Sequence, residues 1–417
     1  WPNLPIAQWS EVIIMNSRVT NIDLSDKGLV GAIPEDVIDI QSMLTADFSD
    51  NDIDGMPDIS GTLPNMTGFN VSGNRLTFED LEPNAGVTNL NFADQQRFGT
   101  VFEDTIPVGS TVDLSQSIGG NFNQYQWYFS NHNTTDQPIG GLTSSELVID
   151  SLIFGNMGQY ELKVTNSAVP GLVLSSELQK AYASADLEFV ALDLGGEPFT
   201  AGEAYALQIT APGSPYDTVQ TIRGEGNGFA FNDLVLGNYL IAVAPDNLIE
   251  FLPTYYESTD LWREADTLLL RDNLIDTLDM AQIPPPGGGD AEVSGTVTRD
   301  DGEPEGRINA RRKVKRAGCS VRRFVPKGRT DQDDEEGTYE LYAYVQSDDE
   351  GRFEFTDLED GKYRFNIEYP GIPMDEDSYV EFTIGEGGIE DEVLILEATV
   401  TDDGIVVQKI ERLGFYR

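Results

Sequence analysis

Cysteine and histidine are almost absent from this sequence: Cys319 and His132 are the only ones in 417 residues. A single cysteine excludes an intrachain disulfide framework. A catalytic triad, a cysteine–histidine pair or a multi-histidine metal site would each have to use the same histidine. That residue lies in the polar run SNHNTTD, which predicts an exposed loop. These scarcities disfavour the common nucleophilic and zinc-dependent enzymes.

Basic residues are also scarce. The chain has 26 Lys and Arg against 72 Asp and Glu, which gives a formal net charge of −46 at pH 7. A surface with this charge repels nucleic acid and anionic lipid headgroups. We therefore expect neither a nucleic-acid partner nor direct membrane insertion. A salty or calcium-containing exterior would screen the self-repulsion of such a chain.

Long apolar runs are missing too, since no segment approaches the roughly 20 apolar residues that span a bilayer. The chain opens on Trp-Pro-Asn without a signal peptide, and we expect a processed protein or a fragment of a longer one. Its 39% hydrophobic and 10% aromatic residues suffice for cores, which excludes global disorder. A length of 417 residues suits three or four domains.

The most informative pattern is a motif that occurs twice. Phe-x-Phe-x-Asp-Leu-x-x-Gly-x-Tyr stands at 229–239 and again, 124 residues later, at 353–363. Aromatics that alternate with other residues predict a half-buried strand, Asp-Leu-x-x-Gly predicts a turn, and Tyr opens the returning strand. The interval is too long for a solenoid repeat, so the motif predicts two copies of one β-sandwich.

Residues 1–95 carry a different repeat, with steps of 24 and 23 residues. Apolar residues recur in three matching sets: Val19, Ile22 and Leu24; Met43, Ala46 and Phe48; Met66, Phe69 and Val71. An asparagine follows each of the last two sets at the same spacing, Asn51 and Asn74. With its Gly-x-Ile-Pro segment at 31–34, this pattern resembles the plant-like leucine-rich repeat. The resemblance implies a short solenoid in which asparagine side chains hydrogen-bond the turning backbone.

Residues 96–184 read as an all-β segment with two landmarks, Trp127 in QYQWYF and Tyr160 in NMGQYELKVTN. They resemble the strand-C tryptophan and the tyrosine corner of an immunoglobulin-like sandwich. Leu162 takes the place of the cysteine that usually follows the corner, and Leu114 is its expected partner. The resemblance therefore implies the sandwich core without its disulfide.

The two motif copies place sandwiches at 185–283 and 291–417. Both segments resemble the transthyretin-like, or carboxypeptidase-regulatory-like, sandwich of bacterial surface proteins. Between them, PPPGGGD at 284–290 predicts a stiff linker that ends in a free swivel. The expected fold is thus mainly β: a short leucine-rich-repeat solenoid followed by three β-sandwich modules in tandem, the last with a basic insertion.

The order of modules resembles that of surface proteins exported by gram-negative bacteria with a type IX secretion system. The strings that carry this resemblance are NRLTFEDLEPN (74–84), FLPTYYESTDLWREADT (251–267) and FNIEYPGIPMDEDSYVEFTIG (365–385). It implies an extracellular or cell-surface location. We expect a non-enzymatic adhesion protein with a protein or polysaccharide ligand and no cofactor. Two alternatives stay open: a self-assembling subunit of a filament or surface layer, and a non-catalytic region of a larger secreted enzyme.

One segment is strongly basic and predicts an interaction patch. Ten of the 26 basic residues lie between positions 307 and 329, followed at once by an acidic run. The segment either forms a charged hairpin neutralised by its own acidic partner or docks onto an acidic neighbour, such as a second copy. The patch residues are Arg307, Arg311, Arg312, Lys313, Lys315, Arg316, Arg322 and Arg323.

Three weaker patterns complete the candidate sites. Asp50, Asp52 and Asp54 match the first half of a calcium loop, although Gly61 stands where its bidentate glutamate belongs. Tyr255, Tyr256 and Trp262 are candidates for an aromatic platform that binds sugar rings. Five Asp-Ser/Thr-apolar triplets resemble the O-glycan acceptor motif of bacteria with the same secretion system; the acceptors would be Thr105, Ser151, Thr218, Thr267 and Thr277.

Overall fold

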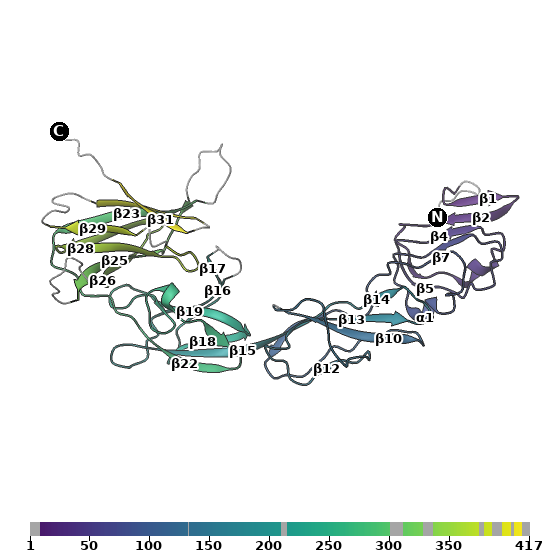
Figure 1. Ribbon diagram of the computed structural model, residues 1–417, viewed down its shortest axis with the longest axis horizontal. Coiled ribbons are helices and arrows are strands. Elements are labelled where there is room, and N and C mark those ends of the chain that lie inside the picture. Colours follow the sequence, from purple (N-terminus) through teal and green to yellow (C-terminus); the bar gives the residue numbers. More distant parts are fainter. Residues whose placement is uncertain are drawn as a thin grey trace. The chain divides into compact units, whose positions relative to one another are not determined.

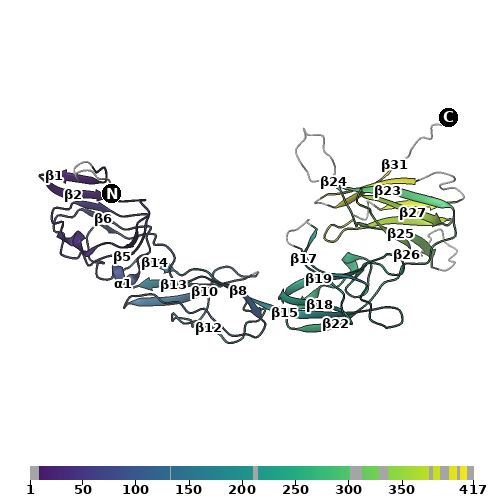
Figure 2. The ribbon, with the colours of Figure 1, turned by 180° about the vertical axis from the view of Figure 1, so that it is seen from behind.

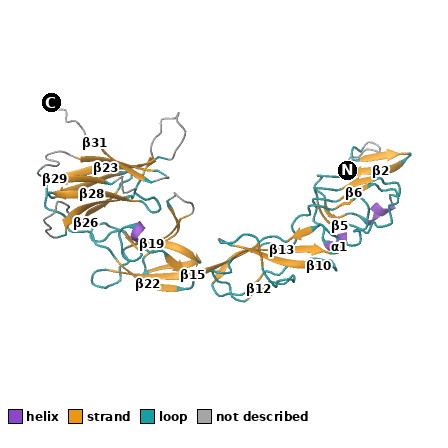
Figure 3. Cartoon of the chain, in the orientation of Figure 1, coloured by secondary structure: helices purple, strands orange, loops and turns teal. Residues whose placement is uncertain are grey.

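The computed structural model describes residues 9–131, 133–209, 215–300, 312–327, 337–374, 379–385, 394–401 and 404–410. They fall into two compact units, Trp1–Ser184 and Ala185–Arg417. The chain is mainly β, as expected, and its helical segments are short (Figures 1 and 3): η2 (Glu35–Asp39), α1 (Phe78–Leu81) and η3 (Trp262–Glu264). None of the helices in the described ranges is long and apolar enough to cross a membrane.

The first unit begins with a stack of parallel strands. In spatial order its sheet contains β1 (Val12–Met15), β2 (Arg18–Asp23), β4 (Thr45–Asp47), β6 (Gly68–Asn70) and β7 (Leu90–Asn91), with β1 antiparallel to β2. Asn21 lies beside Thr45, and Thr45 beside Gly68. The pairing therefore follows the 24- and 23-residue steps of the sequence. A second parallel pair, β3 (Val30–Ala32) and β5 (Asp52–Gly55), runs alongside.

Buried amides hold the turns of this stack together. The Asn51 side chain donates to three carbonyls and accepts from the Lys27 and Leu29 amides. Asn74, fully buried, donates to the carbonyls of Phe48, Val71 and Ser72 and accepts from Ile53. The predicted role of these two asparagines is confirmed. Gln95 continues the ladder in the same way, which the sequence pattern did not reveal.

The stack is joined to the sandwich that follows it by Glu82, the residue after α1. Its carboxylate accepts hydrogen bonds from the Asn121 and Phe122 amides and from the Asn121 and Asn166 side chains. Burial alone would raise the pKa of Glu82, but these donors hold it below its usual value. Glu82 is therefore ionised at neutral pH, and its carboxylate connects the stack to the sandwich of this unit.

The sandwich of the first unit is built around two expected landmarks. Its strands are β8 (Phe102–Pro107), β9 (Val112–Asp113), β10 (Asn123–Ser130), β11 (Gln137–Pro138), β12 (Val148–Ile149), β13 (Gly158–Asn166), β14 (Val173–Ser175) and the start of β15 (Gln179–Leu192). Trp127 is fully buried beside Leu162. The Tyr160 hydroxyl donates to the Asn156 carbonyl, as a tyrosine corner requires. Leu114 and Leu162 are both buried, so apolar packing occupies the places of the usual cysteines.

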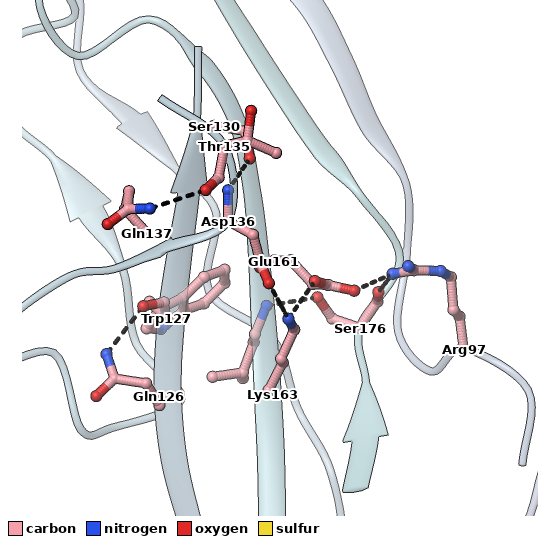
Figure 4. Close-up of polar contacts among 11 residues, drawn as sticks. Arg97, Gln126, Trp127, Ser130, Thr135, Asp136, Gln137, Glu161, Lys163 and Ser176 are labelled. Carbon is pink, nitrogen blue, oxygen red and sulfur yellow. Dashed lines mark hydrogen bonds and ion pairs between the residues drawn. The ribbon is translucent and has the colours of Figure 1, made fainter. Parts of the chain in front are cut away.

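A charge network covers the outer face of this sandwich (Figure 4). Glu161 accepts from Arg97 at 2.6 Å and lies 3.4 Å from Lys163, which also binds Asp136 at 2.8 Å. The Lys163 ammonium stands over the Tyr128 ring, 4.1 Å from its centre. Arg97 pairs with Glu161 on β13 and also donates to the Ser176 carbonyl, directly after β14. The network therefore ties the segment after the stack to both strands. Its members are paired with one another, which favours a structural role.

The second unit contains two sandwiches with the same pattern of strand pairing. The first has β16 (Gly202–Ile209), β17 (Tyr216–Arg223), β18 (Phe229–Val235), β19 (Gly237–Pro245), β20 (Thr254–Tyr255), β21 (Leu268–Leu270), β22 (Leu274–Asp279) and the end of β15. The second has β23 (Ala291–Arg299), β24 (Arg312–Lys313), β25 (Gly318–Pro326), β26 (Gly337–Gln346), β27 (Arg352–Leu358), β28 (Gly361–Glu368), β29 (Val380–Ile384), β30 (Leu394–Val400) and β31 (Ile405–Ile410). We call them the third and fourth sandwiches because they are the third and fourth modules of the chain, after the stack and the sandwich of the first unit.

The strands that carry the repeated motif and their neighbours pair in the same way in both sandwiches. β16 lies between β17 and β19, and β25 lies between β26 and β28. β15 pairs in parallel with β22 and lies beside β18 on its other edge; β23 likewise pairs in parallel with β30 and antiparallel with β27. Duplication of one module, which the repeated motif predicts, requires this correspondence.

The repeated motif has the same conformation in both copies. Its aspartates, Asp233 and Asp357, have φ angles of 55° and 60°. Aspartate tolerates this left-handed conformation better than most residues, which explains its recurrence at the end of the strand. The motif tyrosines donate to carbonyls four residues earlier, Tyr239 to Val235 and Tyr363 to Glu359. Each copy thus closes its turn with the same side chain-to-backbone bond that Tyr160 makes.

The Pro/Gly segment does not behave as the expected swivel. Gly287 and Gly289 lie directly against the fourth sandwich: an added Cβ would come within 2.0 Å of the Tyr342 hydroxyl and 2.0 Å of the Leu358 carbonyl, respectively. Glycine is needed here because it lets the backbone approach closely, not because it is flexible. The prediction of a free swivel is therefore wrong for these residues.

Replacement of Asn74 by alanine should destabilise the stack strongly. The change leaves three carbonyls and one amide without their side-chain partner in a buried place, with an expected loss of about 3 kcal/mol in the free energy of unfolding. Calorimetry of the full chain measures this loss. Asn21→Ala is the matched control, because the Asn21 side chain hydrogen-bonds Thr45 on the partly exposed strand face, and the change should alter stability by about 0.5 kcal/mol or less. Equal effects of the two variants would contradict the assigned role.

Candidate functional site

A polar groove lies on the strand face of the N-terminal stack. It has a volume of about 550 Å³ and is lined by residues of all five strands. Its side chains form two rows that run across the sheet, because in-register parallel strands place equivalent residues side by side, about 4.8 Å apart. One row is Asn21, Thr45 and Gly68, and the other is Asp23, Asp47, Asn70 and Asn91.

The second row owes its order to a repeated local turn. Asp23, Asp47 and Asn70 are each followed two residues later by a serine whose amide and hydroxyl donate to the same side-chain oxygen. The hydrogen bonds from Ser25 hold the pKa of Asp23 below its usual value, so this carboxylate is ionised at neutral pH. The other oxygen of Asp47 accepts from Asn70 at 3.2 Å.

This arrangement can bind a ligand that makes many hydrogen bonds. The groove offers carboxylate acceptors, amide groups that donate and accept, and a threonine hydroxyl, all held by strands rather than by loops. We did not identify the groove from sequence. The available signal was Asp/Asn-x-Ser at positions 23, 47 and 70, in step with the apolar repeat.

The predicted interaction patch is dispersed in the structure. Arg307 and Arg311 lie outside the described residues. Arg312 and Lys313 are exposed on β24, and Lys315 lies 4.0 Å from Asp349 on an exposed turn. Arg316 is exposed and interacts with the Tyr205 hydroxyl of the third sandwich. The sequence cluster is therefore divided among several places.

Arg322 and Arg323 are used within the chain. Arg322 forms an ion pair with Asp260 of the third sandwich, and both side chains are more than four-fifths buried. Arg323 pairs with Glu359 at 2.9 Å and stands over the Tyr342 ring. Arg322 therefore does not belong to an exposed docking patch, and Arg323, with its side chain 35% exposed, is paired within its own sandwich.

Arg322 belongs to a contact between the third and fourth sandwiches, which lie side by side in Figures 1 and 2. We call this contact the sandwich junction. The Tyr216 amide donates to the Pro370 carbonyl, and the Trp262 amide donates to Glu368. An apolar cluster centred on Leu207, Leu240, Ala242 and Tyr255 packs here, with Tyr216 and Trp262 against it.

Glu368 is the most strongly perturbed carboxyl group of the junction. Its residue is 6% exposed, and burial raises its pKa to about 8, although Arg263 and Arg322 nearby favour the charged form. It accepts hydrogen bonds from the Trp262 amide and the Asn366 side chain. At neutral pH it is therefore a largely protonated acid within the junction.

The three aromatics proposed as a sugar platform do not form one. Tyr255 is buried in the junction, and Trp262 packs edge-on against Tyr216. Tyr256 lies against Phe189 and donates to Asp276. Each ring is used for packing, so that prediction was wrong.

The remaining candidates stay predictions. Asp50 and Asp54 are exposed, and Asp52 pairs with Arg75 at 3.1 Å. No group of three metal-ligating side chains occurs within the described ranges, and these aspartates have no added support as a calcium site. The five proposed O-glycan acceptors are all exposed: Thr105, Ser151, Thr218, Thr267 and Thr277. Exposure permits modification without showing that it occurs.

Glu368 predicts a distinctive pH dependence of stability. Its pKa is raised in the folded chain, so the folded state binds this proton more tightly than the unfolded state. The Glu368 contribution to the free energy of unfolding should be fully present below pH 4.5 and should fall as the pH rises to about 8. Urea denaturation of the full chain at intervals from pH 5 to 8 measures this loss.

Glu368→Gln is the comparison that isolates the effect, since glutamine keeps the shape and cannot titrate. The variant should lose less stability than the wild type over the same pH range, and the difference between the two curves removes the contribution of other titrating groups. Parallel curves would show that Glu368 is not protonated in the folded junction.

Comparison with known proteins finds no protein-family model that matches the chain. No curated protein matches either. Distant likenesses to solved structures of tandem β domains are found. The Bacillus anthracis TIE protein is 14% identical with a TM-score of 0.25; the match covers 74% of this chain, which spans 56% of that protein.

A streptococcal ancillary pilin is 13% identical with a TM-score of 0.18, over 67% of this chain and 92% of the pilin. Immunoglobulin domains 1–4 of Sidekick-1 are 11% identical with a TM-score of 0.20, over 73% of each chain. At these scores none of the three carries a conclusion about the function of this chain.

Proposed function

We propose that this protein is a non-enzymatic binding protein of the bacterial cell surface, and that the polar groove of its N-terminal stack contacts the ligand. The observation that carries the proposal is the pair of hydrogen-bonding rows on strands β2, β4, β6 and β7. Their spacing repeats from strand to strand, which suits an extended ligand with repeated polar groups, such as a polysaccharide or a protein segment.

The proposal includes the family of the N-terminal stack, which we assign to the leucine-rich repeats. Steps of 24 and 23 residues, parallel pairing and the buried asparagine ladder support a short leucine-rich-repeat solenoid. The predicted export through a type IX system and the gram-negative source rest on the sequence resemblance alone. The net charge of −46 suits an exterior where salt screens the surface.

The groove is tested by filling it. Gly68 lies at its centre, and a Cβ there would meet only the Thr45 methyl, at 3.9 Å, so Gly68→Trp should fold and obstruct ligand contact. Binding of the full chain to a glycan array and to immobilised collagen, fibronectin and fibrinogen is the measurement. We expect Gly68→Trp to weaken the signal about tenfold or more.

Gly86→Trp is the matched control, because Gly86 belongs to the same stack, does not line the groove and has no atom within 4 Å of an added Cβ. It should bind as the wild type does. If the wild type binds none of these surfaces, or Gly68→Trp binds normally, the groove is not the binding site.

Self-assembly is the second candidate function, because the side chains of Arg312 and Lys313 are exposed on β24, an end strand of its sheet, in a highly acidic protein. Light scattering should then show an oligomer that the double charge reversal Arg312→Glu, Lys313→Glu converts to monomers. Lys409→Glu, on β31 of the same sheet, should leave it intact. A wild-type chain that stays monomeric at high concentration and low salt would exclude this function.

A further inference from the structure

The sandwich junction contains a cavity. It has a volume of about 730 Å³ and opens between the third and fourth sandwiches. Glu203, Tyr205, Arg223 and Asp246 line it from the third sandwich, and Arg316 and Tyr344 from the fourth. This volume lies within the range of about 300–1,000 Å³ in which proteins bind small molecules.

The charges around the cavity are balanced by pairing. Arg223 pairs with Asp246 and lies 4.0 Å from Glu203. Asp260 pairs with Arg322 behind the wall, and Arg316 interacts with Tyr205. With Arg322 counted behind the wall, three guanidinium groups balance the carboxylates of Glu203, Asp246 and Asp260, while Glu368 is the protonated acid described above. A charged ligand would have to displace one of these pairs and would leave one partner without its counter-charge.

The same groups suit a neutral ligand with hydroxyl groups. The Tyr205 hydroxyl donates to Glu203 at 2.7 Å, and the paired carboxylates and guanidiniums retain further acceptor and donor positions. A sugar hydroxyl both donates and accepts, so it can bind between such groups without breaking a pair. The Tyr205 ring, which is only partly buried, adds aromatic surface to the wall, on which the C–H face of a sugar ring packs.

We propose that the junction cavity is a binding site for a neutral oligosaccharide. It is a second site, separate from the groove of the N-terminal stack, and it does not depend on the function assigned to that groove. Residues of both sandwiches are needed to form it, which gives the packing of the duplicated modules a role in recognition. Arg223 positions Glu203 and Asp246 toward the ligand, and Tyr205 supplies a direct contact.

The proposal is tested by titrating the full chain with short neutral oligosaccharides from dextran, xylan, mannan and β-glucan in a calorimeter. Acidic oligosaccharides from polygalacturonate and alginate serve as comparators. We expect at least one neutral oligosaccharide to bind and the acidic ones not to bind. Arg223→Ala should weaken binding about tenfold or more, because it leaves two carboxylates unbalanced beside the ligand.

Arg352→Ala is the matched control. Arg352 is similarly exposed, 63% against 58% for Arg223, and also pairs with two carboxylates, Asp348 and Glu350, but it lies outside the cavity. It should bind as the wild type does. Ala244→Trp fills the cavity from strand β19 and should abolish binding without lowering the melting temperature.

Three results would overturn the proposal: no neutral oligosaccharide binds the wild type, the acidic ones bind instead, or Arg223→Ala and Ala244→Trp bind normally. The groove variant Gly68→Trp separates the two sites. A saccharide signal that Gly68→Trp removes and Ala244→Trp leaves intact belongs to the groove and counts against the cavity.

Discussion

Buried backbone groups at the turns are the constraint on which this structure depends. Strands pair their own amides and carbonyls, but the chain must leave each strand, and the groups freed there need partners. With one cysteine in the sequence, no disulfide can hold these turns. Side chains do so instead: Asn51, Asn74 and Gln95 in the stack, and Tyr160, Tyr239 and Tyr363 in the three sandwiches.

These same side chains made much of the fold predictable from the sequence. An asparagine that bonds a turn must recur at the repeat step, and a corner tyrosine must stand at a fixed place after its strand. The same holds for Asp233 and Asp357, because few residues tolerate their backbone conformation. Local geometry restricts the residue type at such positions. The sequence motifs were therefore enough to predict the mainly β class and the duplicated sandwich.

The contact between the third and fourth sandwiches could not be predicted in the same way. Ser320 and Arg322 on β25, and Asn366 and Glu368 on β28, alternate with core residues and read as a solvated face. They are in fact covered by the third sandwich. Nothing local distinguishes a polar residue that faces water from one that faces a neighbouring module. The same limit applies to the basic segment, whose charges are adjacent in sequence but divided between two faces of a sheet.

The ion pair between Asp260 and Arg322 has a consequence for how these modules can be inherited. One partner lies in each copy of the duplicated sandwich, so neither copy is a self-sufficient part that recombination could move into another protein. A fourth sandwich separated at the Pro/Gly segment would keep Arg322 but lose its partner Asp260. The two sandwiches are therefore expected to be inherited together, although each carries the same motif.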